Sequence, residues 1–197
     1  MGYFSSTHQT GTYFKKTQIR YEEASEKNRE EFVEKLANIK KEHPEKLIYY
    51  IDEMGIDQYI YRPKARAKRG VKVYGKVRGR KFQRLSIVAG KRGKHIVEPM
   101  VFKGTADSLL FEIWFDRYFC PKIAGNIAVM DNASIHRKAK LIEIANKYGI
   151  TIIFLPAYSP DLNKIEGFWA WLKEKLRSTL LICHDLMDAI CYCFQLE

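Results

Sequence analysis

The sequence predicts an α/β fold built on a five-stranded mixed sheet with helices on both faces. Nearly continuous apolar runs, typical of strands buried on both faces, lie at residues 46–52, 126–131 and 150–156. Two further strand-like runs, 82–93 and 94–104, follow each other directly around glycines, which predicts an antiparallel pair. Segments with helical spacing of apolar residues separate or follow the later runs.

The N-terminal elements follow from local signals. Residues 1–24 are polar and irregular, and they predict a linker. A helix is expected to begin at Ser25, a residue suited to the N-cap, and to stop before Pro44. Its apolar positions lie four and three residues apart, at Phe32, Leu36 and Ile39. With 46% hydrophobic residues in 197, the chain can bury one sizeable core. We therefore divide it into a linker with a peripheral helix, 1–45, and one main domain, 46–197.

Helices and strands alternate in the C-terminal half. A helix is predicted at 108–120, which Pro121 closes, and another at 138–149, which Gly149 ends. Two last helices are predicted at 162–177 and 184–196. The order is three strands, helix, strand, helix, strand and helices. This is an antiparallel meander fused to parallel strand-helix units, as in ribonuclease H-like folds.

Charge is concentrated in one part of the chain. The net charge is +11, yet residues 58–97 contain fourteen Lys or Arg and no acidic residue, which leaves the remainder slightly acidic. Such a block predicts a polyanionic partner, most simply duplex DNA held by its phosphates in a salt-dependent way. The alternative is a solvated basic surface loop. The candidate DNA contacts in the block are Lys64, Arg66, Lys68, Arg69, Lys72, Lys76, Arg78, Arg80 and Lys81.

Cysteine usage and hydropathy limit the cellular context. The four cysteines contain no C-x-x-C pair, and no signal peptide is recognisable, so a reduced, intracellular protein is expected. Cys191 and Cys193 lie two apart in a helical segment and so do not share a face, which speaks against a zinc site. No apolar stretch has the length needed to span a membrane.

Three carboxylates stand at element ends. Asp52 ends the run 46–52, Asp131 ends the run 126–131, and Glu166 lies near the start of a predicted helix. Each has a structural alternative: a strand end for Asp52, an Asx turn for Asp131, and a capping box with Asn163 for Glu166. Sites form at the carboxyl ends of neighbouring strands in sheets with parallel strands, so we expect the three to converge.

Three converging carboxylates suit phosphodiester chemistry. Two Mg²⁺ ions about 3.5–4 Å apart can activate the attacking oxygen and neutralise the leaving oxygen of an in-line displacement. Mg²⁺ prefers carboxylate oxygens and keeps several waters, so few protein ligands suffice. We expect Asp52, on a central strand, to bridge the ions, with Asp131 and Glu166 each holding one. The predicted activity is metal-dependent cleavage of DNA strands followed by strand transfer.

Further candidates flank these acids. Lys173 and Arg177 lie seven and eleven residues after Glu166 on the same helix face, where they can contact DNA phosphates. The alternative for both is a solvated helix face. Asn132 and His136 are candidates for an accessory role in orienting the nucleophile or a phosphate. Their alternative is a surface position at a helix start.

Three segments carry a resemblance to a known family. YYIDEMGI, VMDNASIHR and LPAYSPDLNKIEGFWAWLK resemble, in order and spacing, the catalytic blocks of DDE transposases, in the bacterial insertion-sequence branch related to Tc/mariner elements. The resemblance covers residues 10–195. It implies a ribonuclease H-like fold, a metal-binding catalytic triad of Asp52, Asp131 and Glu166, and dependence on Mg²⁺ or Mn²⁺. It also implies cut-and-paste transposition at inverted repeats, usually into a TA dinucleotide.

The resemblance also implies partners and marks departures. The expected partners are double-stranded DNA, as transposon ends and target, and a second copy of the chain in a homodimer, in the cytoplasm of a prokaryote at the nucleoid. Lys164 stands where the family usually has proline, and Met54 where it commonly has serine. Family members carry helix-turn-helix domains upstream, and this chain begins near the end of such a region. A second-frame product, a degenerate element or an excised domain is expected. The rival functions are an inactive DNA-binding remnant and a structure-selective nuclease.

Overall fold

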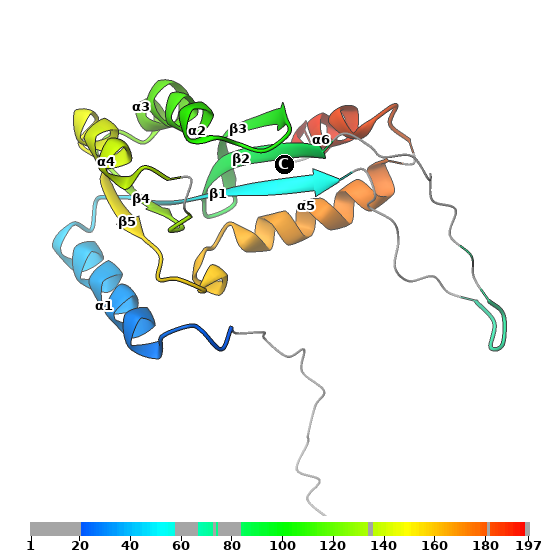
Figure 1. Ribbon diagram of the computed structural model, residues 1–197, viewed down its shortest axis with the longest axis horizontal. Helices are drawn as coiled ribbons and strands as arrows, with labels where there is room; N and C mark the ends of the chain where they lie inside the picture. The colour runs from blue at the N-terminus through cyan, green and yellow to red at the C-terminus, as the bar shows by residue number, and fades with distance from the viewer. Residues whose placement is uncertain are drawn as a thin grey trace, which may run out of the picture.

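One mixed sheet forms the centre of the protein. The computed structural model describes residues 21–57, 67–72, 74, 84–133, 136–180 and 182–195. Its strands are β1 (Ile48–Asp57), β2 (Arg84–Arg92), β3 (His95–Lys103), β4 (Ile127–Met130) and β5 (Thr151–Phe154). They are arranged in the order β3-β2-β1-β4-β5 (Figure 1). The pairs β1–β2 and β2–β3 are antiparallel, whereas β1–β4 and β4–β5 are parallel, as the sequence predicted.

The central strand β1 is longer than its apolar run. It continues to Asp57, because it pairs with β2 along most of its length, from Tyr50–Lys91 to Asp57–Arg84. Its pairing with the short β4 stops at Tyr50. The expectation that Asp52 ends the strand is therefore wrong. Asp52 lies within β1, just beyond the point where β1 and β4 stop pairing.

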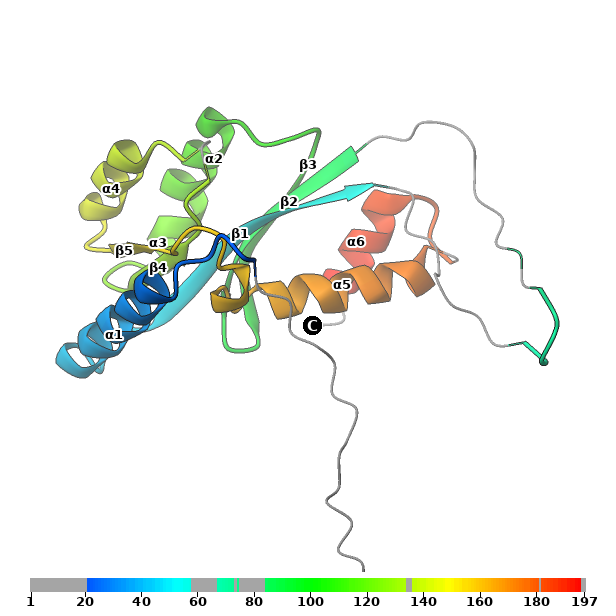
Figure 2. The same cartoon turned by 60° about the horizontal axis from the view of Figure 1, so that its bottom comes forward.

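Helices cover both faces of the sheet, as predicted. On one face, α5 (Glu166–Thr179) and α6 (Leu186–Gln195) share a buried cluster with β1, β2 and Phe32 of α1 (Glu26–Glu42). On the other face lie α2 (Ser108–Trp114), the π-helical turn Phe115–Phe119, α3 (Cys120–Lys122) and α4 (Lys138–Lys147). Figure 2 shows α5 and α6 beneath the long strands and α2 and α4 above the short ones. None of the helices that the structure describes is long and apolar enough to cross a membrane.

The first helix matches its sequence signals. The Ser25 hydroxyl caps α1 by accepting a hydrogen bond from the Asn28 N–H at 3.3 Å, and the helix ends at Glu42. Phe32 is buried in the same cluster as the sheet, so α1 packs on the main core. The domain division at residue 45 stays a prediction.

The helix after β3 does not stop where proline predicted. It passes through the π-helical turn and continues to Lys122, with Pro121 in the first turn of α3. Proline lacks an N–H, and the wider turn removes the need for a regular helical bond at that point. Phe119 from this turn packs on Gly90 of β2, where a Cβ would lie 2.0 Å from the ring carbon Cε2. Gly90 therefore admits the ring that seats the helical segment on the sheet.

Candidate active site

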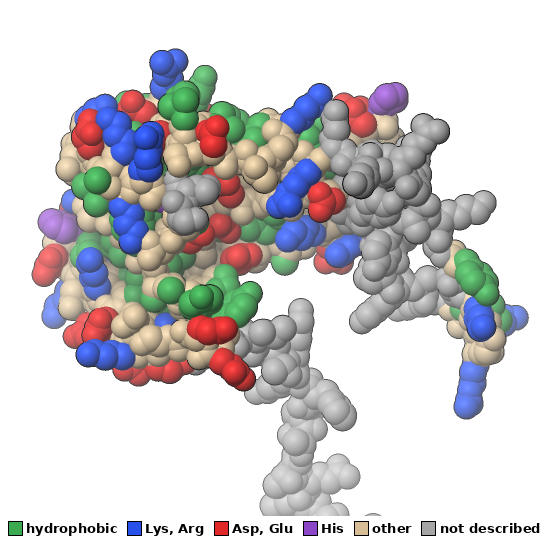
Figure 3. All heavy atoms as spheres, viewed as in Figure 1, with side chains coloured by type: hydrophobic (Ala, Val, Ile, Leu, Met, Phe, Trp, Pro, Cys, Tyr) green, Lys and Arg blue, Asp and Glu red, His purple; other side chains and the backbone are tan. Residues whose placement is uncertain are grey.

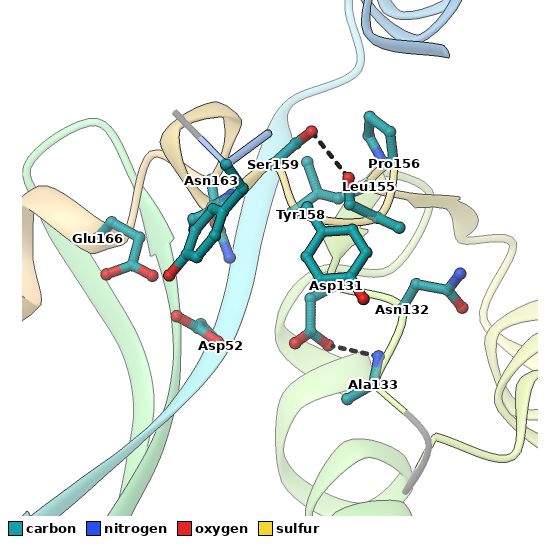
Figure 4. A pocket seen from close by; sticks show the side chains of 13 residues that line it. Asp52, Asp131, Asn132, Ala133, Leu155, Pro156, Tyr158, Ser159, Asn163 and Glu166 are labelled. Atoms are coloured by element: carbon teal, nitrogen blue, oxygen red, sulfur yellow. Dashed lines mark hydrogen bonds between the residues drawn. The ribbon is translucent and has the colours of Figure 1, made fainter. Parts of the chain in front are cut away.

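A cavity opens where β1 and β4 part. It has a volume of about 460 Å³ and is lined by Asp52, Asp131 and Glu166 together with residues of the segment before α5. Figure 4 shows the three carboxylates turned toward the same open space, from a strand, a strand end and a helix start. In the space-filling view of Figure 3, acidic side chains gather beside a hollow between α1 and the body of the sheet. The cavity is thus the meeting point of the three predicted acids.

Asp52 is tied to the helix that carries Glu166. The indole Nε1–H of Trp169 donates to Asp52 Oδ2 at 3.0 Å, and Trp169 is almost fully buried in α5. Burial, followed by the nearby charges of Glu166 and Asp131, raises the pKa of Asp52 to about 7, although hydrogen bonds from the Glu53 amide and from Trp169 act to lower it. In the absence of a cation, a large fraction of Asp52 is therefore protonated near neutral pH.

Asp131 directly follows β4, and its pKa is shifted in the opposite direction to that of Asp52. Its Oδ1 accepts the Ala133 N–H at 3.2 Å and lies 3.0 Å from His136 Nε2. Burial acts to raise the pKa of Asp131, but the bond and charge of His136, with the Ala133 amide, bring it below its ordinary value. Both contacts fall on Oδ1, so neither uses Oδ2. The Asx turn, the structural alternative for Asp131, is therefore present. It occupies only Oδ1, and Oδ2 remains available to another ligand.

His136 is not the surface residue that its alternative suggested. Its side chain is only 6% exposed, and its ring lies 4.3 Å from the ring of Phe111 in α2, measured between centroids. Asn132 is exposed and lines the cavity. Glu53, the chain neighbour of Asp52, does not line the cavity; burial and the charge of Asp131 raise its pKa above the ordinary value although His136 acts to lower it.

Glu166 opens α5, and its capping-box alternative is wrong. Asn163 does not cap the helix, because its Nδ2 donates to the Ile51 carbonyl at 3.1 Å, and Ile165 occupies the N-cap position. Burial raises the pKa of Glu166, Lys173 lowers it, and Asp131 raises it. Lys164, at the position where the resemblance implies a proline, directs its Nζ over the Tyr50 ring at 5.6 Å. The departure therefore adds a cation–π contact on β1.

The three acids line one cavity without forming a ready-made cage for a single ion. Among the described residues, only His184, Asp185 and Asp188 form a trio whose ligand atoms all lie within 4.8 Å of one another. That trio is exposed, and Asp185 is engaged as the cap of α6, accepting the Asp188 N–H at 2.9 Å. The wider spacing around Asp52 suits two ions better than one, since a pair of Mg²⁺ ions spans about 3.5–4 Å.

The donor set of the cavity fits hard divalent cations. It offers carboxylate oxygens, which Mg²⁺ and Mn²⁺ prefer, and no thiolate among its lining residues. The raised pKa values of Asp52 and Glu166 express like-charge crowding and burial that a bound cation would relieve.

The predicted basic residues fall into three groups. Lys173 is exposed and close enough to Glu166 to lower its pKa, whereas Arg177 is half-buried and its Nε has no hydrogen-bond partner within the described part of the chain. Lys68, Arg69 and Lys72 are exposed. The remaining candidates lie outside the described residues: Lys64, Arg66, Lys76, Arg78, Arg80 and Lys81. The basic block is not one loop, since its residues from Arg84 onward form the β2–β3 hairpin.

Sequence patterns did not predict the long-range contacts that shape the cavity. Tyr21 and Tyr158 line it, and Arg29 of α1 holds Asp161 through two hydrogen bonds of 2.8 and 2.6 Å. None of these side chains forms a metal-binding pattern, and Arg29 and Asp161 are 132 positions apart. The one available signal was the resemblance of the block LPAYSPDLNKIEGFWAWLK, which contains Tyr158 and Asp161.

Fold and site together define a class: ribonuclease H-like proteins with carboxylates gathered at the carboxyl end of the parallel strands. A family model described as DDE superfamily endonuclease matches residues 47–186. The chain therefore belongs to the DDE superfamily of endonucleases. No curated protein matches it by sequence.

Solved structures show the same fold. The Mos1 strand transfer complex is 18% identical with a TM-score of 0.64, covering 84% of this chain and 53% of that one. The Mos1 transposase paired-end complex with the left transposon end is 17% identical with a TM-score of 0.61, covering 85% and 54%. The catalytic domain of Mos1 mariner transposase is 15% identical with a TM-score of 0.55, covering 80% and 73%. The chain thus spans about half the length of the chains in the two complexes, and the ribonuclease H-like fold is confirmed.

Proposed function

We propose that this chain is the catalytic domain of a DNA transposase, in the insertion-sequence branch related to Tc/mariner elements, that cuts and joins DNA strands with divalent metal ions. The observation that carries the proposal is the single cavity lined by Asp52, Asp131 and Glu166, which stand in the three blocks that resemble the catalytic blocks of the family. Membership of the DDE superfamily supports the same chemistry.

Asp52, Asp131 and Glu166 would together hold two Mg²⁺ ions, or Mn²⁺ in their place. When bound, the metal supplies activation of the attacking oxygen and neutralisation of the leaving oxygen. The chain's own residues set the ligands in place. Trp169 fixes one oxygen of Asp52, and His136 fixes one oxygen of Asp131. Cleavage by water and attack by the freed 3′-hydroxyl are both in-line displacements, so one site can perform them in turn.

Double-stranded DNA is the proposed substrate, as transposon ends and as target. Support comes from Lys173, which is close enough to Glu166 to lower its pKa, and from the fold likeness to Mos1 assemblies described as strand transfer and paired-end complexes. The remaining candidate contacts of residues 64–81, with Arg177, would hold phosphates without reading sequence. A homodimer that pairs two DNA ends, at the nucleoid of a prokaryotic cytoplasm, completes the proposal.

The test is cleavage of labelled duplex DNA with Mg²⁺ by the wild-type chain and by Asp131→Asn. The variant keeps an oxygen for Ala133 and His136 but loses the charge, so nicking is expected to fall by about a hundredfold or more. Asp188→Asn, which removes an exposed acid from the other trio, is the matched control and should nick at the wild-type rate.

The same assay separates the rivals. DNA binding by the wild-type chain without metal-dependent nicking would identify an inactive remnant. Nicking confined to branched junctions would identify a structure-selective nuclease. Equal nicking by Asp131→Asn and wild type would remove the proposed active site itself.

A further inference from the structure

Tyr158 adopts a backbone conformation that tyrosine normally avoids. Its φ is +55°, in the left-handed region, and its side chain is 56% exposed. A bulky residue in this region costs free energy and persists only where its surroundings impose it. Such positions cluster at functional sites, and here the exposed ring lies at the lining of the cavity that holds the three acids.

The segment around Tyr158 is anchored on both sides. The next residue, Ser159, is buried, and its hydroxyl donates to the Ala157 carbonyl at 3.1 Å. Further along, Asp161 is held by the nearly buried Arg29 of α1, and Asn163 is bonded to β1. The fold therefore fixes the backbone at Tyr158 while leaving its ring in solvent. Figure 4 shows the ring above the pocket floor, near Asp131.

A second tyrosine stands beside the first. The Tyr21 ring lies 6.2 Å from that of Tyr158, measured between centroids, with the planes tilted by 47°. Tyr21 is 52% exposed and lines the same cavity. The two rings are tilted rather than stacked and both are half-exposed, so aromatic surface remains open toward the cavity. Half-exposed aromatic side chains at a fixed position are the feature by which proteins stack single nucleobases.

The charges of the cavity determine which part of DNA can approach the two tyrosine rings. The cavity floor carries three carboxyl groups, which repel phosphate unless cations intervene. Tyrosine is neutral, and a nucleobase is neutral and aromatic, so a base can approach the rings without that repulsion. The cavity volume of about 460 Å³ falls within the range of about 300–1,000 Å³ typical of small-molecule sites.

We propose that Tyr158 and Tyr21 form a nucleobase subsite, in which one unpaired base next to the reacting phosphate stacks on the Tyr158 ring. The inference rests on the proposed function, because the acids must hold the neighbouring phosphate. Stacking offsets part of the cost of unpairing that base, so DNA with a base already unpaired beside the cut should bind more tightly than fully paired DNA. Tyr158 then positions the substrate and takes no part in proton or metal chemistry.

The experiment uses a short duplex with one unpaired 2-aminopurine, whose fluorescence falls when it stacks on an aromatic ring. Binding is measured with Mg²⁺ for the wild type, Tyr158→Phe and Tyr158→Asn. Phenylalanine keeps the ring, and asparagine tolerates the left-handed backbone but has no ring. Tyr118→Ala, at a tyrosine that is 53% exposed in the π-helical turn, is the matched control.

Wild type, Tyr158→Phe and Tyr118→Ala are expected to quench the fluorescence. Tyr158→Asn should lose the quenching and bind the unpaired duplex about five- to a hundredfold more weakly, with little change for fully paired DNA. Nicking of both duplexes is followed in parallel. Equal quenching by wild type and Tyr158→Asn, or no quenching by a wild type that nicks, overturns the subsite and leaves the proposed function standing. Ring-dependent quenching without nicking supports the subsite and refutes the proposed function.

Discussion

The end of β4 and the middle of β1 hold two acids of the same cavity in opposite ways. At β4, Asp131 has a hydrogen-bonding histidine and a backbone amide, and its pKa lies below the ordinary value. At β1, Asp52 is buried beside acidic neighbours, and hydrogen bonds from the Trp169 indole and the Glu53 amide do not offset these effects, so its pKa is raised to about 7. The protein supplies the compensation for one charge and leaves the other to be compensated by a cation. The site is therefore partly organised before metal binds.

The largest expected effects are those of substituting Asp52 and Asp131. Both substitutions should reduce activity, but they should change stability in opposite directions. Asp52→Asn and Asp131→Asn should both reduce Mg²⁺-dependent nicking by about a hundredfold or more, because each removes a ligand charge. Their metal-free stabilities should differ in direction at pH 8. Asp52→Asn is expected to be more stable than wild type and Asp131→Asn less stable, as measured by thermal denaturation in a chelator.

The direction follows from the two pKa shifts. The pKa of folded Asp52 lies above its ordinary value of 3.8, so folding takes up a proton and wild-type stability falls as pH rises from about 4 to 7. Asparagine removes that loss, and the advantage of Asp52→Asn should vanish at pH 4. The pKa of Asp131 is lowered, so its contribution is present above the unfolded pKa and is lost as pH falls. Parallel behaviour of the two variants would break the comparison.

The next effect concerns the histidine that distinguishes the two acids. His136→Phe keeps a ring against Phe111 but loses the contact with Asp131, so nicking should fall by about 10- to 100-fold. His136→Gln, which can place an N–H near the Nε2 position, should recover part of the loss. A steady-state nicking assay over a range of Mg²⁺ concentrations measures both. Unchanged metal dependence in His136→Phe would show that the histidine has no part in orienting Asp131.

A smaller effect is expected at the pair that anchors the segment before α5. Arg29→Met should lower the free energy of unfolding by about 1.5–3 kcal/mol, since it removes two charge-assisted bonds to Asp161. Arg29→Lys should recover only part, because lysine cannot make the two-pronged contact. Lys27→Met, at an exposed ion pair of 3.9 Å with Glu31, is the control and should change stability by less than about 0.5 kcal/mol. Urea denaturation gives all three values, and equal losses for Arg29→Met and Lys27→Met would contradict the anchoring role.

Local patterns in the sequence were enough for the elements but not for the contacts between them. Apolar runs predicted all five strands, Ser25 predicted the start of α1, and Gly149 predicted the end of α4 to within two residues. The pattern could not show that β1 continues past Asp52, because that depends on pairing with β2 after β4 has ended. Asn163 has the sequence form of a cap, yet its side chain bonds to Ile51, 112 positions away.

The sequence also could not predict the contacts that surround the three acids. His136, which lies outside any helix, is buried against Phe111 of α2, and the segment of the left-handed Tyr158 is anchored by Arg29 of α1. Each contact joins residues far apart in the chain, which periodicity cannot pair. The sequence could therefore name the three acids, but not their unequal charge states.

The most direct test of the account is to soak crystals of the chain with Mn²⁺ and record its anomalous scattering. Two peaks are expected in the cavity, with Asp52 between them and Asp131 and Glu166 each next to one, and both should be lost in Asp52→Asn. Peaks confined to the exposed His184, Asp185 and Asp188, or no peak near Asp52 in crystals that bind Mn²⁺ elsewhere, would contradict it.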